Sequence, residues 1–171
     1  LEFGRDLAVV AGQIDITKEK QIELSESITN VAAKTGIARD ELLQAFTRIV
    51  DKSGDLELAD TKLQKIAKTI IGTKADAGEL GELLAAMSVS FRTKGAGAGD
   101  IFNFLEMLIA QGDKGAINLA ALASEGENLF GAFTRAGFST QKQLAEFGAL
   151  LQVSAAGGNK AAAATFVANF I

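Results

Sequence analysis

Asp100-Ile-Phe-Asn-Phe-Leu-Glu-Met-Leu-Ile-Ala110 is the most apolar stretch of the chain and decides its fold class. If it forms a helix, only a narrow polar stripe through Asn103 and Glu106 interrupts an apolar surface. We therefore predict a buried central helix that begins at Asp100 and is surrounded by amphipathic neighbours. The stretch is too short to cross a membrane, because a membrane-spanning helix needs roughly 20 apolar residues.

The composition of the whole chain favours an all-α fold. Its 171 residues include no Pro, whereas average usage would give about eight. Proline is the strongest helix breaker, and the abundant Ala and Leu are among the best helix formers. A chain of this size buries roughly 70% of its unfolded surface, which is enough for a hydrophobic core. We expect a single helical domain over residues 1–171, excised from a longer protein.

The missing side-chain types limit the chemistry that the chain can perform. It contains no Cys and no His, so it lacks a thiolate nucleophile, a Cys-type zinc site and the commonest general base. We therefore expect no enzyme activity, no catalytic residue, no cofactor, no metal ligand and no small-molecule substrate. The net charge of -4 argues against nucleic acid as a partner, because nucleic-acid-binding proteins normally carry a basic excess.

Glycines and N-cap residues divide the sequence into short amphipathic segments. A first helix carries Phe3, Leu7 and Val10 on one face and is expected to end near Gly12. Later helices are expected to begin at Thr17, Ala38, Asp55, Asp76, Asp100, Asn118, Ser139 and Asn159. Asp76 and Glu79 have the spacing of a capping box. The helix expected at Asp55 continues in phase through Ile70.

These start signals indicate a repeat of helical hairpins. Taken two at a time, they recur every 38 to 45 residues, roughly the length of HEAT and armadillo-like repeats. We predict about eight or nine short amphipathic helices, arranged as stacked helical hairpins in a solenoid-like array or as an irregular bundle. The glycine-rich stretch 93–99 is typical of a linker and gives a possible hinge between sub-domains 1–92 and 100–171.

Two segments resemble ligand-binding loops. Asp51-x-Ser53-x-Asp55 has the first three ligand positions of a calcium loop, but Leu56 replaces the required Gly and Lys62 replaces the bidentate Glu. It therefore predicts a turn between helices. Gly95-x-Gly97-x-Gly99 could offer backbone amides to a phosphate, but a preceding strand, the dinucleotide spacing and a P-loop Lys are missing. This segment predicts a flexible linker.

Lysines and phenylalanines form two further patterns. Lys62, Lys65 and Lys68 recur at helical spacing, with Lys52 and Lys74 nearby; they predict a solvated helix face, and weak contact with DNA is the alternative. The chain has 11 Phe and no Tyr or Trp. Most fall on apolar helix faces, which predicts core packing, with a hydrophobic binding groove as the alternative. Examples are Phe46, Phe91, Phe104, Phe133 and Phe147.

Acidic pairs are the only remaining source of catalytic groups. Asp40 and Glu41 are one such pair, and Glu125 and Glu127 are another. Adjacent residues point to different faces of a helix, so these carboxylates are not expected to converge on a substrate. The pairs therefore support the expectation that the chain is not an enzyme.

Three segments carry a resemblance to a known family. Lys34-Thr-Gly-Ile-Ala-Arg-Asp-Glu-Leu-Leu-Gln-Ala-Phe46 contains a Gly-Ile turn that leads into a helix. Residues 136–153 contain Ala145-Glu-Phe-Gly-Ala-Leu-Leu151, followed by the small residues of 154–164. Together with residues 116–133, they resemble the core region of phage tail tape measure proteins. The match covers roughly 32–171, and the family's Gly-Ile-Lys-Gly-Ser-like turn is reduced here to Ala-Gly-Gly-Asn.

The resemblance implies a structural and assembly function. The chain would be a helical domain of a phage or prophage tail tape measure protein, which occupies the lumen of the tail tube in the virion and sets tail length during assembly in the bacterial cytoplasm. Implied partners are other copies of itself, tail tube and tail tip proteins, and tail assembly chaperones. We expect the apolar end near Phe166, Phe170 and Ile171 to favour self-association. The alternative is a helical-repeat protein–protein interaction module.

Overall fold

The computed structural model describes residues 2–112 continuously and short pieces between residues 119 and 149. Residues 2–112 form helices and turns, without a strand, which confirms the all-α prediction for this part of the chain. The helices are α1 (Glu2–Gln13), α2 (Lys18–Thr35), α3 (Arg39–Ser53), α4 (Leu56–Thr61), α5 (Leu63–Thr73), α6 (Ala77–Arg92) and α7 (Ala98–Gly112). No helix among these is long and apolar enough to cross a membrane.

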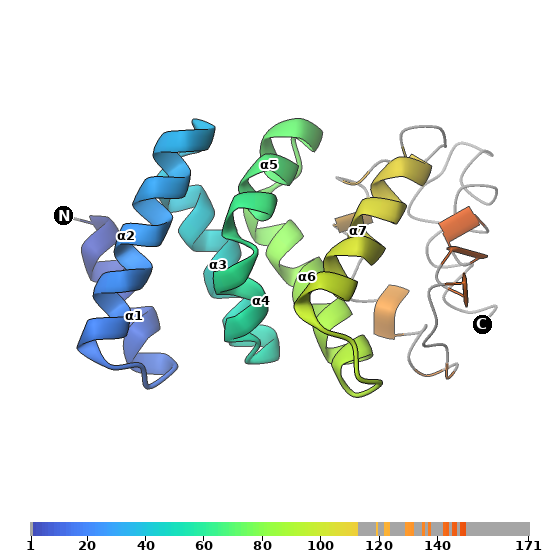
Figure 1. The fold of residues 1–171 in the computed structure, drawn as a ribbon, viewed down its shortest axis with the longest axis horizontal. Coiled ribbons are helices and arrows are strands. Elements are labelled where there is room, and N and C mark those ends of the chain that lie inside the picture. The colour runs from blue at the N-terminus through green and yellow to red at the C-terminus, as the bar shows by residue number, and fades with distance from the viewer. Residues whose placement is uncertain are drawn as a thin grey trace.

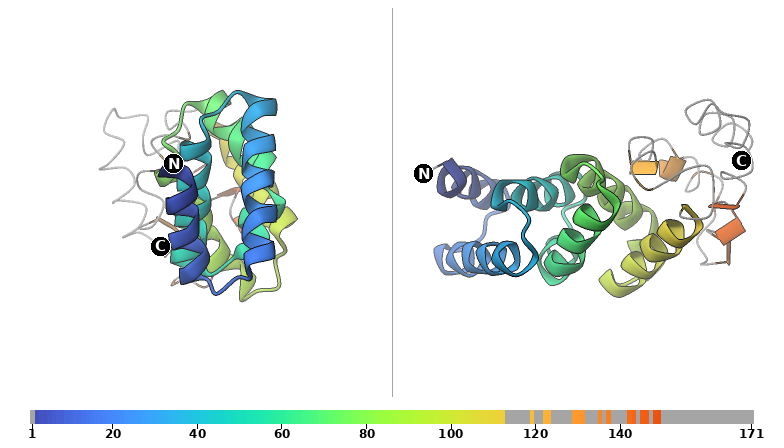
Figure 2. Two further views of the ribbon diagram at one scale, coloured as in Figure 1. Left: turned by 90° about the vertical axis from the view of Figure 1, so that its left-hand side faces the viewer. Right: turned by 90° about the horizontal axis from the view of Figure 1, so that it is seen from above.

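The helices form two layers of stacked hairpins. α1, α3 and α6 make one layer, and α2, α4, α5 and α7 make the other, which faces the viewer in Figure 1. The view from above in Figure 2 shows both rows, and the chain crosses between them at every connection except the bend from α4 to α5, which stays in one row. The helices of the first layer begin at residues 2, 39 and 77, so the repeat has the length of one hairpin. This arrangement confirms the prediction of stacked helical hairpins for the described part of the chain.

Most helix ends lie where the sequence predicts them. Thr17 Oγ1 accepts a hydrogen bond from the Lys20 N–H at 3.3 Å, and Asp76 Oδ1 accepts one from the Glu79 N–H at 3.0 Å. Both side chains satisfy an otherwise unpaired donor in the first helical turn. Gly36 ends α2 in the left-handed region, with φ of 81°, a conformation that glycine adopts without steric cost.

Two helix boundaries differ from the prediction. The helix expected from Asp55 through Ile70 is two helices, because Lys62 leaves the helical region with φ of -109° and ψ of 8°. This bend lets α4 contact α3 and α7 while α5 contacts α2. α7 begins at Ala98 rather than at Asp100, whose Oδ2 instead accepts the Gly97 N–H at 2.8 Å from within the first turn. This bond satisfies the backbone donor that precedes the helix.

The most enclosed helix within residues 2–112 is α6, which corrects the prediction of a central helix beginning at Asp100. α7 keeps the predicted polar stripe, since Asn103 and Glu106 are exposed. α6 is buried on several sides because Gly81 allows it to approach α3 closely. A Cβ added there would lie 2.6 Å from the carbonyl oxygen of Ala45. The close contact is possible because Gly81 has no side chain. Hydrophobic periodicity does not reveal this, since it records only where apolar side chains are present.

The turn that joins α6 to α7 is closed by backbone hydrogen bonds. The Ala96 N–H donates to the Phe91 carbonyl at 3.1 Å, and Gly95 has φ of 86°. The rings of Phe91 and Phe104 pack across the turn with centroids 4.6 Å apart. The hinge at 93–99 stays a prediction. Most of the segment that follows α7, including the helix starts at Asn118, Ser139 and Asn159, lies outside the described residues.

Candidate interaction surface

A groove runs along the layer of α1, α3 and α6, between α1 and α3. The two helices point the same way: the Arg39 guanidinium lies 4.9 Å from the centre of the Phe3 ring at one end, and Ile14 and Val50 line a common hollow at the other. The groove has a volume of about 410 Å³. Its lining residues are Asp6, Val9, Val10, Gln13, Asp40, Leu43, Gln44, Thr47, Arg48 and Asp51. We call this feature the α1/α3 groove.

Helical spacing explains which side chains border the groove. On α3, Asp40, Gln44 and Asp51 follow each other by about one or two turns, which places them on one face. On α1, Asp6, Val9 and Gln13 form the matching stripe. Val9 is 57% exposed, unlike the neighbouring Val10, which is buried. The groove therefore combines an apolar floor with a polar border whose charged residues are three Asp and one Arg.

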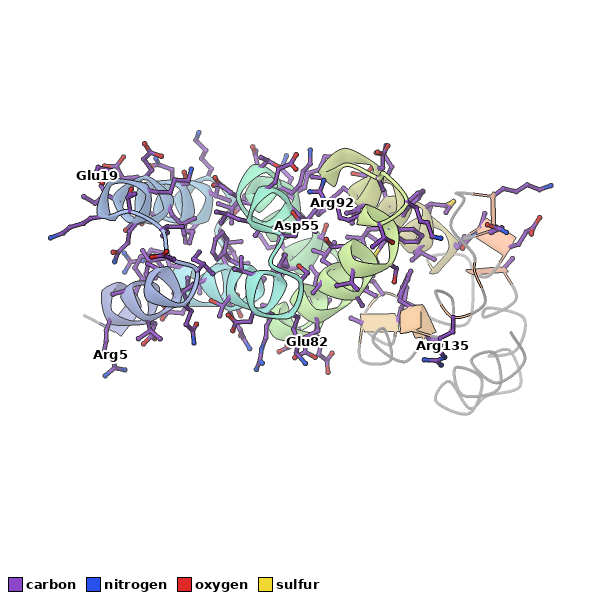
Figure 3. All side chains as sticks on the ribbon, turned by 90° about the horizontal axis from the view of Figure 1, so that it is seen from below. Arg5, Glu19, Asp55, Glu82, Arg92 and Arg135 are labelled. Atoms are coloured by element: carbon purple, nitrogen blue, oxygen red, sulfur yellow. The ribbon has the colours of Figure 1, made fainter. Side chains whose placement is uncertain are left out.

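A second hollow lies farther along the same layer, over α6. We call it the α6 pocket; it has a volume of about 430 Å³. It is lined by Lys52, Glu82, Ala85, Ala86, Val89, Ser90, Gly131 and Arg135. Arg48 Nη1 and Glu82 Oε1 lie 3.6 Å apart and form a bridge between the α1/α3 groove and the α6 pocket. Figure 3 shows Glu82 and Arg135 on the same side of the array as Arg5 of α1.

The opposite layer is joined by ion pairs between successive hairpins. Lys20 Nζ donates to Asp60 Oδ2 at 3.0 Å, which joins α2 to α4. This hydrogen bond raises the pKa of Lys20 above its usual value. Lys65 Nζ donates to Glu106 Oε1 at 2.8 Å, which joins α5 to α7, and it lies 5.7 Å from the centre of the Phe102 ring. The charged side chains at these contacts are therefore paired with side chains of neighbouring helices.

A further link, between the two layers, is formed by Asp55 and Arg92. Arg92 Nε and Nη2 donate to the two carboxylate oxygens of Asp55, each at 2.8 Å, and Nη2 also donates to Glu57 Oε2 at 3.0 Å. The Ser88 hydroxyl donates to Asp55 Oδ2. Asp55 Oδ1 accepts from the Leu58 N–H at 2.9 Å and so caps α4. The same carboxylate therefore starts one helix and holds the end of another, as the labelled side chains in Figure 3 show.

The electrostatics of Asp55 follow from this environment. Its side chain is only 7% exposed. Burial by itself raises the pKa of Asp55, but the hydrogen bonds from Arg92 and Ser88 outweigh it, so the pKa lies below its usual value. Arg92 responds in the opposite direction, because its hydrogen bond with Asp55 raises the pKa of the guanidinium. Both carboxylate oxygens of Asp55 accept hydrogen bonds, so this residue has a structural role and links successive hairpins.

The two segments that resembled ligand-binding loops lie at helix ends, where their polar groups bond to the fold itself. Residues 51–53 are the last turn of α3, and Gly54 and Asp55 connect α3 to α4, in agreement with the predicted link between helices. Ser53 Oγ donates to the Ile49 carbonyl at 2.6 Å and accepts from the Asp55 N–H at 3.2 Å. Residues 95–99 lead into α7, and Gly97 donates its N–H to Asp100. Within the described part of the chain, no three acidic side chains gather where they could hold a metal ion.

The structure also tests part of the predictions made from the lysine and phenylalanine patterns. Lys65 and Lys68 lie on the exposed face of α5, as predicted, although Lys65 is engaged by Glu106. Phe46, Phe91 and Phe104 are buried, which confirms core packing for these three. Phe133, Phe147, Glu125 and Glu127 lie outside the described residues, while Asp40 and Glu41 are exposed on α3.

Sequence reasoning named Val10, Asp40 and Asp51 of the α1/α3 groove for other reasons and did not bring the lining residues together as one site. Val9 provides a signal that could have found it, because it is a large apolar residue off the buried face that Phe3, Leu7 and Val10 define. The opposing Asp40 and Asp51 come from another hairpin, and their proximity depends on how α1 and α3 pack. Comparison with known proteins adds no assignment, since no family model, no curated protein and no solved structure matches the chain.

Proposed function

We propose that this chain is a helical-repeat module for protein–protein interaction and that it binds partners through the layer of α1, α3 and α6. One observation supports this choice above all: the α1/α3 groove and the α6 pocket lie in succession along that layer. Stacked helical hairpins characteristically present such extended surfaces to other proteins. The proposal assigns no catalytic residue and no cofactor.

Within this class, we propose that the module belongs to a phage tail tape measure protein. The support is the resemblance carried by Lys34–Phe46 and by residues 116–133 and 136–153. In the structure, Lys34–Phe46 spans the end of α2, the Gly36 turn and the first half of α3. The module would then act as an assembly scaffold in the tail lumen, with other copies of itself, tail tube and tip proteins, and tail assembly chaperones as partners.

The interaction function can be tested by site-specific photo-crosslinking in cells that express the protein. Among the described residues, four large apolar side chains are strongly exposed, two on each layer. Val9 of α1 and Val89 of α6 are 57% and 54% exposed, whereas Ile22 of α2 and Ile71 of α5 are 54% and 47% exposed. A photoreactive phenylalanine analogue at each position samples the two layers equally, because the four sites have similar accessibility.

The proposal predicts a discrete crosslinked partner from positions 9 and 89, identified by mass spectrometry, and much weaker crosslinking from positions 22 and 71. Equal yields from all four positions would show that neither layer is a preferred surface. Crosslinking only from positions 22 and 71 would assign binding to the opposite layer and overturn the proposal.

The tape measure assignment is tested separately by the coding neighbourhood. A reading frame several times longer than 171 residues, flanked by genes for tail tube, assembly chaperone and baseplate proteins, is the expected result. A short frame among metabolic or regulatory genes would overturn this assignment and leave the interaction module.

A further inference from the structure

The border of the α1/α3 groove carries uncompensated negative charge. Asp40 and Asp51 of α3 are exposed, and their carboxylates have no hydrogen bond or ion pair with any residue that the structure describes. Asp6 of α1 has one partner, Arg5, at 3.4 Å, and both side chains are more than half exposed, so this pair is weak. Arg48 is the basic residue of the lining, and it lies against Glu82 on the side of α6.

The shape of the groove favours a helical occupant. Two parallel helices leave a furrow along their line of contact, and a third helix packs into such a furrow with its own side-chain ridges. Val9 and Val10 of α1 and Leu43 of α3 supply an apolar floor. Amphipathic helices bind such floors through apolar residues one helical turn apart, as in other helix-in-groove complexes.

Charge then selects the kind of helix. A carboxylate border attracts Lys and Arg placed beside the apolar stripe of a partner and repels Asp, Glu and phosphate. We propose that the α1/α3 groove binds a basic amphipathic helix of a protein partner, with the apolar stripe on Val9, Val10 and Leu43 and the flanking basic side chains against Asp40 and Asp51. This inference rests on the proposed interaction function and adds the chemical class of the partner.

A pair of synthetic peptides tests this inference on the 171-residue chain. The first peptide, about 14 residues long to match the groove between α1 and α3, carries Leu at positions i, i+3, i+4 and i+7 and Lys on both flanks. The second replaces every Lys with Glu. Fluorescence anisotropy of the labelled peptides should show saturable binding of the basic peptide that weakens with salt and no binding of the acidic peptide.

Matched variants separate the groove from the overall charge. Asp40→Lys with Asp51→Lys reverses the border, and Glu19→Lys with Glu26→Lys on α2 changes the net charge equally. The pairs are comparable because Asp40 and Glu19 each lie in the first turn of a helix and all four residues are exposed. We expect the groove variant to weaken binding at least about tenfold and the α2 variant to change it less than about threefold. Equal weakening by both would overturn the inference.

A second pair of matched variants tests the apolar floor of the groove. Val9→Arg should abolish binding of the basic peptide, whereas Ile22→Arg on α2 should leave it nearly unchanged, since both side chains are more than half exposed and neither supports the core. Binding of the acidic peptide as tightly as the basic one, or loss of binding in Ile22→Arg alone, would overturn the inference. Crosslinks from positions 9 and 89 to a partner that lacks a basic helix would overturn it too, while the interaction function would stand.

Discussion

The two layers of this array hold the same repeating hairpins together in different ways. In the layer of α2, α4, α5 and α7, ion pairs such as Lys20 with Asp60 and Lys65 with Glu106 connect successive hairpins. In the layer of α1, α3 and α6, α3 and α6 pack closely at Gly81, and two hollows remain, one of which is bordered by the unpaired carboxylates of Asp40 and Asp51.

The difference teaches how one repeat can separate stability from binding. Charged groups that are paired inside the fold are not available to a partner, whereas unpaired carboxylates beside an apolar floor are. The pair of Asp55 and Arg92 joins the start of α4 to the end of α6 and so links the two layers. The carboxylates of Asp40 and Asp51 that border the α1/α3 groove make no such pair within the described residues and so contribute no ion pair to the stability of the fold.

The largest expected effect comes from removing Arg92. Arg92→Met leaves the Asp55 carboxylate nearly buried without its charged partner, which should lower the free energy of unfolding by about 2–3 kcal/mol. Urea denaturation followed by circular dichroism measures the change. The double variant with Asp55→Asn should recover part of the loss, because no charge is then left unpaired. An unfolding free energy unchanged in Arg92→Met would show that the pair does not hold α4 and α6 together.

Close packing in the other layer is tested by Gly81→Ala. The new Cβ would lie 2.6 Å from the Ala45 carbonyl oxygen and 2.8 Å from the Arg48 Cβ, so α3 and α6 must separate, and the protein should lose about 2 kcal/mol of stability. Gly72→Ala in α5 is the control, because a Cβ there meets nothing within 4 Å. It should gain about 0.5–1 kcal/mol from helix propensity. Stabilisation by both substitutions would contradict the close approach of α3 and α6.

The pH dependence of stability gives a smaller effect that is specific to the link between Asp55 and Arg92. Because the pKa of Asp55 is lower in the folded protein than its usual value, its stabilising contribution is complete above the usual pKa and disappears as pH falls through the folded pKa. Unfolding free energies of the native protein and of Asp55→Asn should therefore differ most near pH 6, above the usual pKa, and converge as pH falls through the folded pKa. A difference that grows on acidification would reverse the sign that we assign.

The smallest expected effect concerns the exposed pair of Lys65 and Glu106. Their side chains are 49% and 53% exposed, so solvent screens the interaction, and Lys65→Met should cost less than about 1 kcal/mol. A double-mutant cycle with Glu106→Gln, measured by thermal unfolding at low and high salt, isolates the pair. A loss of unfolding free energy as large as that of Arg92→Met would show that exposed pairs join the hairpins as strongly as the pair of Asp55 and Arg92 does.

Helix ends were predictable because their causes lie within a few residues. Thr17 and Asp76 cap their helices through bonds to backbone groups three residues away, and Gly36 ends α2 through its own backbone freedom. The bend at Lys62 was missed because the apolar pattern from Ala59 to Ile70 stays in phase across it. Periodicity reports which side of a helix is buried, and a bend that preserves this side leaves no trace in the pattern.

The hairpin repeat, the apolar faces and the scarcity of catalytic groups are therefore properties of the sequence itself, since each depends on local spacing or on composition. The tertiary structure decided which helix is most enclosed, how Asp55 meets Arg92, and that Val9 faces Asp40 and Asp51 across a groove. These features join residues from different hairpins. Their proximity depends on how closely two helices approach, and at Gly81 that approach is set by a side chain that is absent.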